Sequence, residues 1–320
     1  MGGGVSTPDY DQLIDAETWA YIARLDAAYP PDAVEMTIRE QRHVYDQMCR
    51  IFDQGRPEGI VVRDMPYGAV PCRIYEKAAT DVTVVYYHGG GFVVGGLDSH
   101  DDICAAICDR TGYRVISVEY SLAPEVVFPG CFNDAYAAFE AIAKVHPGPI
   151  MMAGDSAGGN LAAAVTHQAR TGVPGRIVGQ VLIYPGLGGD LGQGSYVEHA
   201  NAPQLTAADL AFYHKVRVGD GAPPTDDPRF APLCDTDFSG LPPSVLITAE
   251  CDPLAGDGGA YRDKVLGAGG QAVWFNEPGM VHGCLRARGM STRAAAFFDK
   301  VVDGIGALGR GEWPYANAPD

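Results

Sequence analysis

The chain has 320 residues, of which 47% are hydrophobic, and this is enough for a sizeable core. Its 23 Lys and Arg residues stand against 40 Asp and Glu residues, and the net charge of −17 disfavours partners such as nucleic acid or anionic membranes. No apolar run is long enough to span a bilayer, and no signal-peptide pattern opens the sequence. We therefore expect a cytoplasmic protein.

Two helix-like stretches, 8–29 and 31–52, come before any strand. Leu13, Trp19 and Ile22 recur at helical spacing, and the Tyr-Pro-Pro sequence between the stretches is a helix stop. A parallel-sheet domain does not usually begin with two helices. Residues 1–55 are therefore predicted to lie outside the sheet and to contribute to a cap.

From residue 59 the pattern changes to strands. Residues 60–64 and 70–75, separated by a Pro-Tyr-Gly turn, predict an antiparallel hairpin at a sheet edge. Continuous apolar runs follow, mostly with helix-like segments between them, and such runs are typical of parallel strands covered on both faces. Residues 56–320 are therefore predicted to form an α/β domain with a mostly parallel central sheet between helices. The six runs are 82–87, 114–118, 149–153, 178–184, 244–248 and 272–275.

The segment 186–239 interrupts this alternation with Gly-, Asp- and Pro-rich loops around one helix, predicted over 206–216. Thr206 and Asp209 form a variant of the capping box, which marks the start of that helix. An insertion here would lie above the carboxyl ends of the strands, where ligands bind in such sheets. We expect it to be a second part of the cap.

A tight turn between a buried strand and a helix carries the first candidate catalytic residue. The sequence Gly154-Asp155-Ser156-Ala157-Gly158 matches the nucleophile elbow, in which glycines flank a serine held on a strained turn. The pattern alone is also compatible with a glycine-rich turn that has no chemistry. The apolar run before it and the alanine-rich run after it favour Ser156 as a nucleophile.

A serine hydroxyl needs a base and an orienting acid, and in this fold the chain order is Ser, acid, His. Asp252 follows the run 244–248, and His282 lies in a loop after the run 272–275. These residues are predicted to be the acid and the base. Glu250 and Asp257 remain alternatives for the acid.

The glycines at 89 to 91 follow the run 82–87, and they could point backbone amides into a cavity. Gly89 and Gly90, together with the amide of Ala157 at a helix start, are predicted to be the oxyanion donors. A flexible loop or a phosphate-binding nest is the alternative for these glycines. No Lys-Ser or Lys-Thr pair of the P-loop type follows them.

Several other residues could hold a metal ion. His100, Cys104 and Cys108 are spaced to share one helix face, but no fourth ligand lies nearby in the sequence, and a packed helix face is the better interpretation. We predict no metal site. The eight cysteines include no C-x-x-C pair and are predicted to be reduced and mostly buried.

Five motifs in order resemble the hormone-sensitive-lipase-like family (family IV) of bacterial esterases, from about residue 55 to the C-terminus. They are HGGGF at 88–92, YSLAPE at 120–125, GDSAGGN at 154–160, DPL at 252–254 and VHG at 281–283. The resemblance implies an α/β-hydrolase fold with a helical cap and hydrolysis of short- to medium-chain acyl esters without a cofactor. It also implies the roles of Ser156, Asp252 and His282 given above, and family members are often homodimers.

The chain departs from the family where Ser121 replaces a common Arg and where Ala255-Gly256 replaces Arg in the DPLRD pattern. Both changes remove a guanidinium, which affects local rigidity rather than the three catalytic candidates. Phe92 and Tyr184 are further candidates for substrate contact. The expected function is a carboxylesterase acting on a small-molecule ester. An amidase, lactonase or sugar deacetylase with the same residues, or a non-catalytic ligand receptor on the same fold, remains an alternative.

Overall fold

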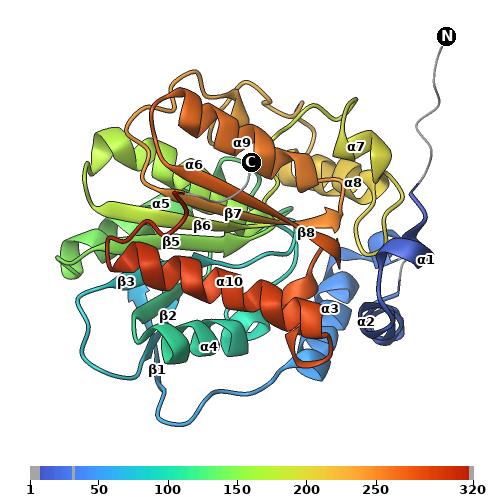
Figure 1. Ribbon diagram of the computed structural model, residues 1–320, viewed down its shortest axis with the longest axis horizontal. Coiled ribbons are helices and arrows are strands. Elements are labelled where there is room, and N and C mark those ends of the chain that lie inside the picture. The colour runs from blue at the N-terminus through green and yellow to red at the C-terminus, as the bar shows by residue number, and fades with distance from the viewer. Residues whose placement is uncertain (1–7, 31–32, 317–320) are drawn as a thin grey trace.

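A computed structural model describes residues 8–30 and 33–316. Its centre is an eight-stranded sheet with the strand order β1-β2-β4-β3-β5-β6-β7-β8 (Figure 1). The β1–β2 and β2–β4 pairs are antiparallel, and the remaining pairs are parallel. The predicted α/β fold with a mostly parallel sheet is thus confirmed. The strands are β1 Val61–Tyr67, β2 Val70–Glu76, β3 Thr83–Tyr87, β4 Arg114–Val118, β5 Ile150–Asp155, β6 Ile177–Ile183, β7 Ser244–Cys251 and β8 Ala272–Val281.

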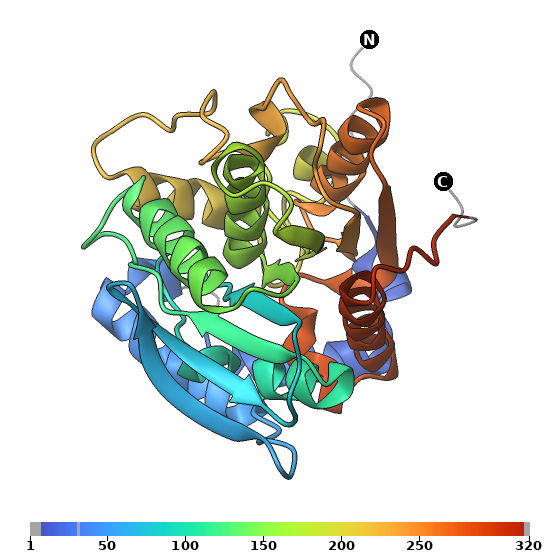
Figure 2. The same cartoon turned by 90° about the vertical axis from the view of Figure 1, so that its left-hand side faces the viewer.

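Helices cover both faces of the sheet, which explains why the central strands are continuously apolar. On one face, α4 (Asp101–Thr111) and α10 (Thr292–Gly309) bury side chains such as Ile103 and Phe297 against the sheet. On the other face, α5 (Gly130–Val145), α6 (Ala157–Gly172) and α9 (Ala255–Gly267) bury side chains such as Phe139 and Leu161. The two layers are seen in Figure 2.

The N-terminal stretches are more divided than predicted. The expected helix over 8–29 consists of α1 (Tyr10–Leu13) and α2 (Ala16–Asp26), because Asp15 caps a new helix by accepting from the amide of Thr18. The expected helix over 31–52 begins as a 3₁₀ turn, η1 (Ala33–Glu35), and continues as α3 (Ile38–Phe52). Residues 31 and 32 lie outside the described part. Thr37 and Glu40 form a capping box at the start of α3.

The segment 186–239 contains α7 (Ser195–Glu198), α8 (Ala207–Val218) and η3 (Pro232–Cys234). The predicted capping box of Thr206 and Asp209 is present at the start of α8. Two side-chain contacts link this segment to the N-terminal helices: Gln204 donates to Asp26 at 3.0 Å, and the Tyr10 hydroxyl lies 3.2 Å from His199 Nδ1. Figure 1 shows both groups of helices, blue and yellow, at the same end of the sheet.

The last two strands extend further than predicted. Strand β7 reaches Cys251 and β8 reaches Val281, and these two residues pair across a register shift that follows Ala249. Asp252 and His282 therefore leave their strands directly, and a short 3₁₀ helix, η4 (Cys284–Gly289), follows. In the described part of the chain, none of the helices has the length and apolar character needed to cross a membrane.

Candidate active site

Ser156 lies on the turn between β5 and α6, and its backbone is strained. Its φ of +54° and ψ of −117° are uncommon for a residue with a side chain. The flanking glycines are required by close packing: a Cβ at Gly158 would lie 1.9 Å from the carbonyl oxygen of Tyr87, and one at Gly154 would lie 2.4 Å from that of Gly158. The tight turn leaves Ser156 partly exposed at the wall of a cavity.

Three of the predicted residues meet in a hydrogen-bonded chain. Ser156 Oγ lies 2.9 Å from His282 Nε2, and His282 Nδ1 lies 2.6 Å from Asp252 Oδ2. Asp252 is fully buried, and its other oxygen accepts from the amide of Leu254 at 2.9 Å. A carboxylate can only accept here, so the proton of the neutral imidazole is assigned to Nδ1. Nε2 is then free to accept from the serine hydroxyl.

The alternative acids are engaged elsewhere. Glu250 accepts from the amide of Gly279 at 2.7 Å. Asp257 accepts from the amide of Leu187 at 2.6 Å and from the Tyr196 hydroxyl at 2.9 Å. Asp252 is therefore the carboxylate that the structure brings to His282.

The oxyanion loop, defined here as residues 88–94 after β3, differs from the prediction at Gly89. The amide of Gly89 donates to Asp155 Oδ1 at 3.0 Å, so it is not available to a substrate oxygen. Gly90, Gly91 and Ala157 line the cavity, and their amides have no acceptor within the described residues. Gly90 and Gly91 have φ values of +126° and +60°, which a residue with a side chain rarely adopts.

Asp155 holds the start of this loop from beneath. Its carboxylate also accepts from the Tyr86 hydroxyl at 2.8 Å, and His100 Nε2 lies 3.3 Å away. Burial alone would raise the pKa of Asp155, but interactions with His100, Tyr86 and Arg286 bring it well below its usual range. Asp155 is therefore ionised at neutral pH and fixes the position of Gly89.

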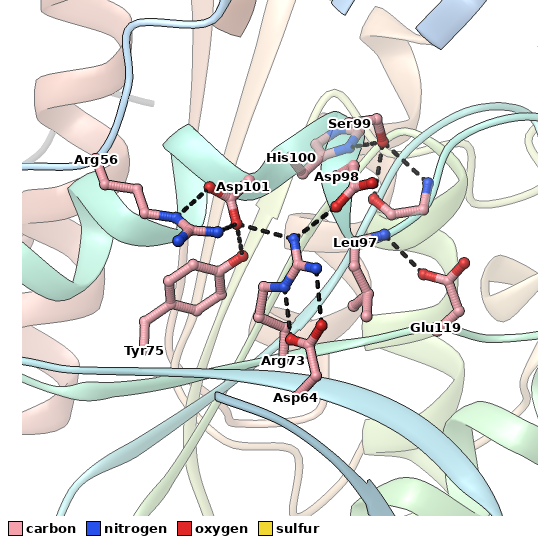
Figure 3. A network of polar contacts seen from close by, with 11 residues as sticks. Arg56, Asp64, Arg73, Tyr75, Leu97, Asp98, Ser99, His100, Asp101 and Glu119 are labelled. Atoms are coloured by element: carbon pink, nitrogen blue, oxygen red, sulfur yellow. Dashed lines mark hydrogen bonds and ion pairs between the residues drawn. The ribbon is translucent and has the colours of Figure 1, made fainter. Parts of the chain in front are cut away.

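A polar network supports the segment that carries His100 (Figure 3). Arg73 on β2 pairs with Asp98 at 2.7 Å and with Asp101 at 3.0 Å, on either side of His100. The Ser99 hydroxyl lies 2.8 Å from His100 Nδ1, which orients the ring. The network thereby joins the antiparallel edge of the sheet, through His100, to Asp155 beside Ser156.

The cavity above Ser156 has a volume of about 920 Å³ and is mostly apolar. It is lined by residues of α2 and α3, of the segment 186–239 and of the strand ends. Both predicted contact residues belong to its wall. The Tyr184 ring centroid is 4.8 Å from that of His282, and both Tyr184 and Phe92 are almost completely buried. Of the two, Tyr184 is the one beside the catalytic candidates.

Comparison with known proteins places the chain in a family. A model of the α/β-hydrolase fold matches residues 84–286. The carboxylesterase NlhH of Mycobacterium tuberculosis is 39% identical over 227 residues, which are 67% of this chain and 70% of that protein. LipN, a carboxylic ester hydrolase of the same organism, is 35% identical over 258 residues, 76% of this chain and 68% of LipN. The chain belongs to the hormone-sensitive-lipase-like family of α/β hydrolases.

Solved structures of this α/β-hydrolase family agree in fold. The ester hydrolase EH1AB1 from the Lake Arreo metagenome has a TM-score of 0.84 and 30% identity, covering 92% of this chain and 99% of that one. A bacterial heroin esterase has a TM-score of 0.83 and 28% identity, covering 94% and 99%. The chain is thus an enzyme related to bacterial carboxylesterases.

Other features of this α/β hydrolase concern residues outside the catalytic candidates. All eight cysteines are free, and all except Cys234 are buried, as predicted. Among residues 8–30 and 33–316, no group of three or more His, Cys, Asp or Glu side chains could hold a metal ion. Sequence reasoning missed the supporting role of Asp155, and it considered His100 only as a possible metal ligand. Asp155 lies inside the Gly154–Gly158 motif, and its position directly before Ser156 could have indicated its role from the sequence.

Proposed function

We propose that this protein is a carboxylesterase that hydrolyses short- to medium-chain acyl esters by way of an acyl-enzyme intermediate. The hydrogen-bonded chain from Ser156 through His282 to Asp252 carries the proposal. Such a chain converts a weak nucleophile into a reactive one. The names of the relatives support an ester as the substrate, and the proposed reaction needs no cofactor.

In the first half of the reaction, His282 Nε2 takes the proton of Ser156 while Oγ attacks the acyl carbon. The carbonyl oxygen becomes an oxyanion, which the amides of Gly90, Gly91 and Ala157 stabilise. We assign Gly91 in place of Gly89, because the Gly89 amide is used by Asp155. The tetrahedral intermediate then breaks its bond to the leaving oxygen, and His282 returns the proton to the alcohol.

In the second half, His282 takes a proton from water, and the resulting hydroxide attacks the acyl carbon of the ester on Ser156. The same amides stabilise the second oxyanion. Collapse of this intermediate breaks the bond to Ser156 Oγ, which receives the proton from His282, and the carboxylic acid leaves. Asp252 stabilises the imidazolium form of His282 in both halves, because its buried carboxylate accepts from Nδ1.

The N-terminal helices and the segment 186–239 form the proposed cap. Both contribute to the wall of the cavity above Ser156, and Gln204 joins them through Asp26. A cap over the reacting groups reduces their contact with water, which strengthens the electrostatic interactions in the site.

The Ser156→Ala variant tests the proposal. Its turnover of p-nitrophenyl butyrate should fall by about 10³-fold or more, with an unchanged circular dichroism spectrum. The wild-type protein should also release a burst of p-nitrophenol equal to the number of active sites when deacylation is the slower step. Retained turnover in the variant would exclude Ser156 as the nucleophile. An inactive wild type that still binds the ester would instead favour a ligand receptor on this fold.

A further inference from the structure

Helix α8 of the proposed cap rests on the oxyanion loop through two side chains on one face. Tyr213 and Arg217 are four residues apart and therefore neighbours along the helix. Tyr213 lies against Gly91, and Arg217 lies against Phe92. In Figure 1, α8 is the yellow helix next to α7.

The contact at Gly91 is close. A Cβ added to this glycine would lie 2.5 Å from Cδ1 of the Tyr213 ring, which is too close for two carbon atoms that are not bonded. The ring thus packs directly on the backbone of a residue whose amide we assign to the oxyanion. A glycine with a φ of +60° has no side chain of its own to restrain it, so the ring supplies the restraint.

The contact at Phe92 is made by a buried cation. The Arg217 guanidinium carbon lies 3.6 Å from the ring centroid of Phe92 and 4.1 Å from that of Phe230, and the residue is only 2% exposed. Its guanidinium is paired with no carboxylate of residues 8–30 or 33–316. Burial lowers the pKa of Arg217 to about 10, so the guanidinium still carries its charge at neutral pH.

The same guanidinium donates two hydrogen bonds, one of which reaches α6. Nη2 donates to Asn160 Oδ1 at 3.2 Å, and Nη1 donates to the carbonyl oxygen of Phe230 at 3.3 Å. Asn160 is in the first turn of α6, where its backbone N–H donates to the carbonyl oxygen of Ser156 at 3.0 Å. Arg217 therefore contacts both segments that supply the proposed oxyanion donors: the loop of Gly90 and Gly91, and the helix start at Ala157.

An apolar residue would fill this space without the desolvation penalty of a buried charge. Stacking on aromatic rings recovers only part of that penalty. A flat group that stacks on the loop and donates along its edge to α6 is a geometry that only arginine provides. We propose that Arg217 is a positioning residue that sets the spacing between the two halves of the oxyanion site.

This inference rests on the proposed esterase function and deepens it. Oxyanion donors act when they lie about 2.7–3.1 Å from the developing negative charge, which exists only in the transition state. A disturbed spacing should therefore lower kcat and leave KM nearly unchanged. Loss of a whole donor costs about 10²- to 10³-fold in kcat, so a displaced pair should cost about 10- to 100-fold.

The test compares Arg217→Met, which keeps an unbranched apolar stem, with Arg217→Lys, which keeps the charge but cannot stack and donate in the same way. Lys215→Met is the matched control, because it removes a cation from an exposed position of the same helix. Active sites are counted by titration with a p-nitrophenyl phosphonate, so that kcat refers only to folded enzyme. We expect Arg217→Met to lose about 10- to 100-fold in kcat with KM within about threefold, and Arg217→Lys to recover only part of the loss.

The control should stay within about twofold of the wild type in both constants, as is usual for a surface substitution. A kcat per active site that stays at the wild-type value in both Arg217 variants would overturn the inference, as would a change confined to KM. If Arg217→Met does not fold, Arg217→Lys decides by the same criteria. An active wild type with an inactive Ser156→Ala variant upholds the esterase proposal whichever way the Arg217 variants behave.

Discussion

His282 can accept the proton of Ser156 only while its imidazole is neutral, so the proposed reaction depends on pH. The value of kcat/KM should therefore decline once the pH is lowered far enough for the imidazole to be protonated. A pH-stat that titrates the released acid measures this directly, with the Ser156→Ala variant as the blank at each pH. A profile that stays level down to about pH 4 would exclude histidine as the base.

The sequence was sufficient to predict the site residues that directly follow strands. Ser156, Asp252 and His282 each leave the carboxyl end of a strand, and the chain order of this fold assigns them to one site. The choice among three successive glycines could not be made in this way. It depends on which amide faces Asp155, a carboxylate held in place by Tyr86 and His100 from other elements.

At the scale of elements, Asp257 joins α9 to the loop that leads into α7. It accepts from the amides of Leu187 and Gly188, and burial raises its pKa from an ordinary value of 3.8 to about 6. The protonated carboxyl group therefore favours folding at a pH below about 4, and this contribution is lost as the pH rises through about 6. The Asp257→Asn variant does not undergo this loss. The difference between its free energy of unfolding and that of the wild type should thus rise by about 2 kcal/mol from pH 4.5 to pH 8.

Urea unfolding of both proteins at several pH values in this range measures the difference. The amide of the variant also changes the hydrogen bonds, but this effect does not vary with pH. Asp263→Asn is the control, because Asp263 is on the exposed side of the same helix. A constant difference between the wild type and Asp257→Asn across the range would show that Asp257 is ionised throughout.

The strands were predictable as elements because continuous burial demands continuous apolar runs. The ends of the strands were harder to predict. The last part of β8 contains Asn276, Glu277 and Pro278, which carry no strand signal, yet it continues beside β7 across a register shift. Pairing with a neighbour overrides local preference there. The N-terminal helices were divided by Asp15 and Thr37, short polar side chains whose capping role depends on the backbone around them.

At the scale of the whole molecule, the cavity above Ser156 is built by parts of the chain far apart in sequence. Ile22 and Leu25 come from α2, Leu205 and Leu210 from the segment 186–239, and Tyr184 from the end of β6. Neither segment of the proposed cap forms the wall above Ser156 alone. The sequence indicated that both lie near the strand ends, but the size of the space between them depends on how their side chains meet.

The apolar wall of this cavity should make acyl-chain length the main determinant of activity. Each methylene buried against the apolar wall contributes about 0.8 kcal/mol, which is about a fourfold gain in kcat/KM while the chain still fits. A chain that extends past the apolar wall beside Ser156 has to displace side chains of the proposed cap, and the gain reverses. A series of p-nitrophenyl esters with a constant leaving group should therefore pass through a maximum among short to medium chains. A maximum at dodecanoate or longer would contradict the proposal that the two segments confine the acyl chain.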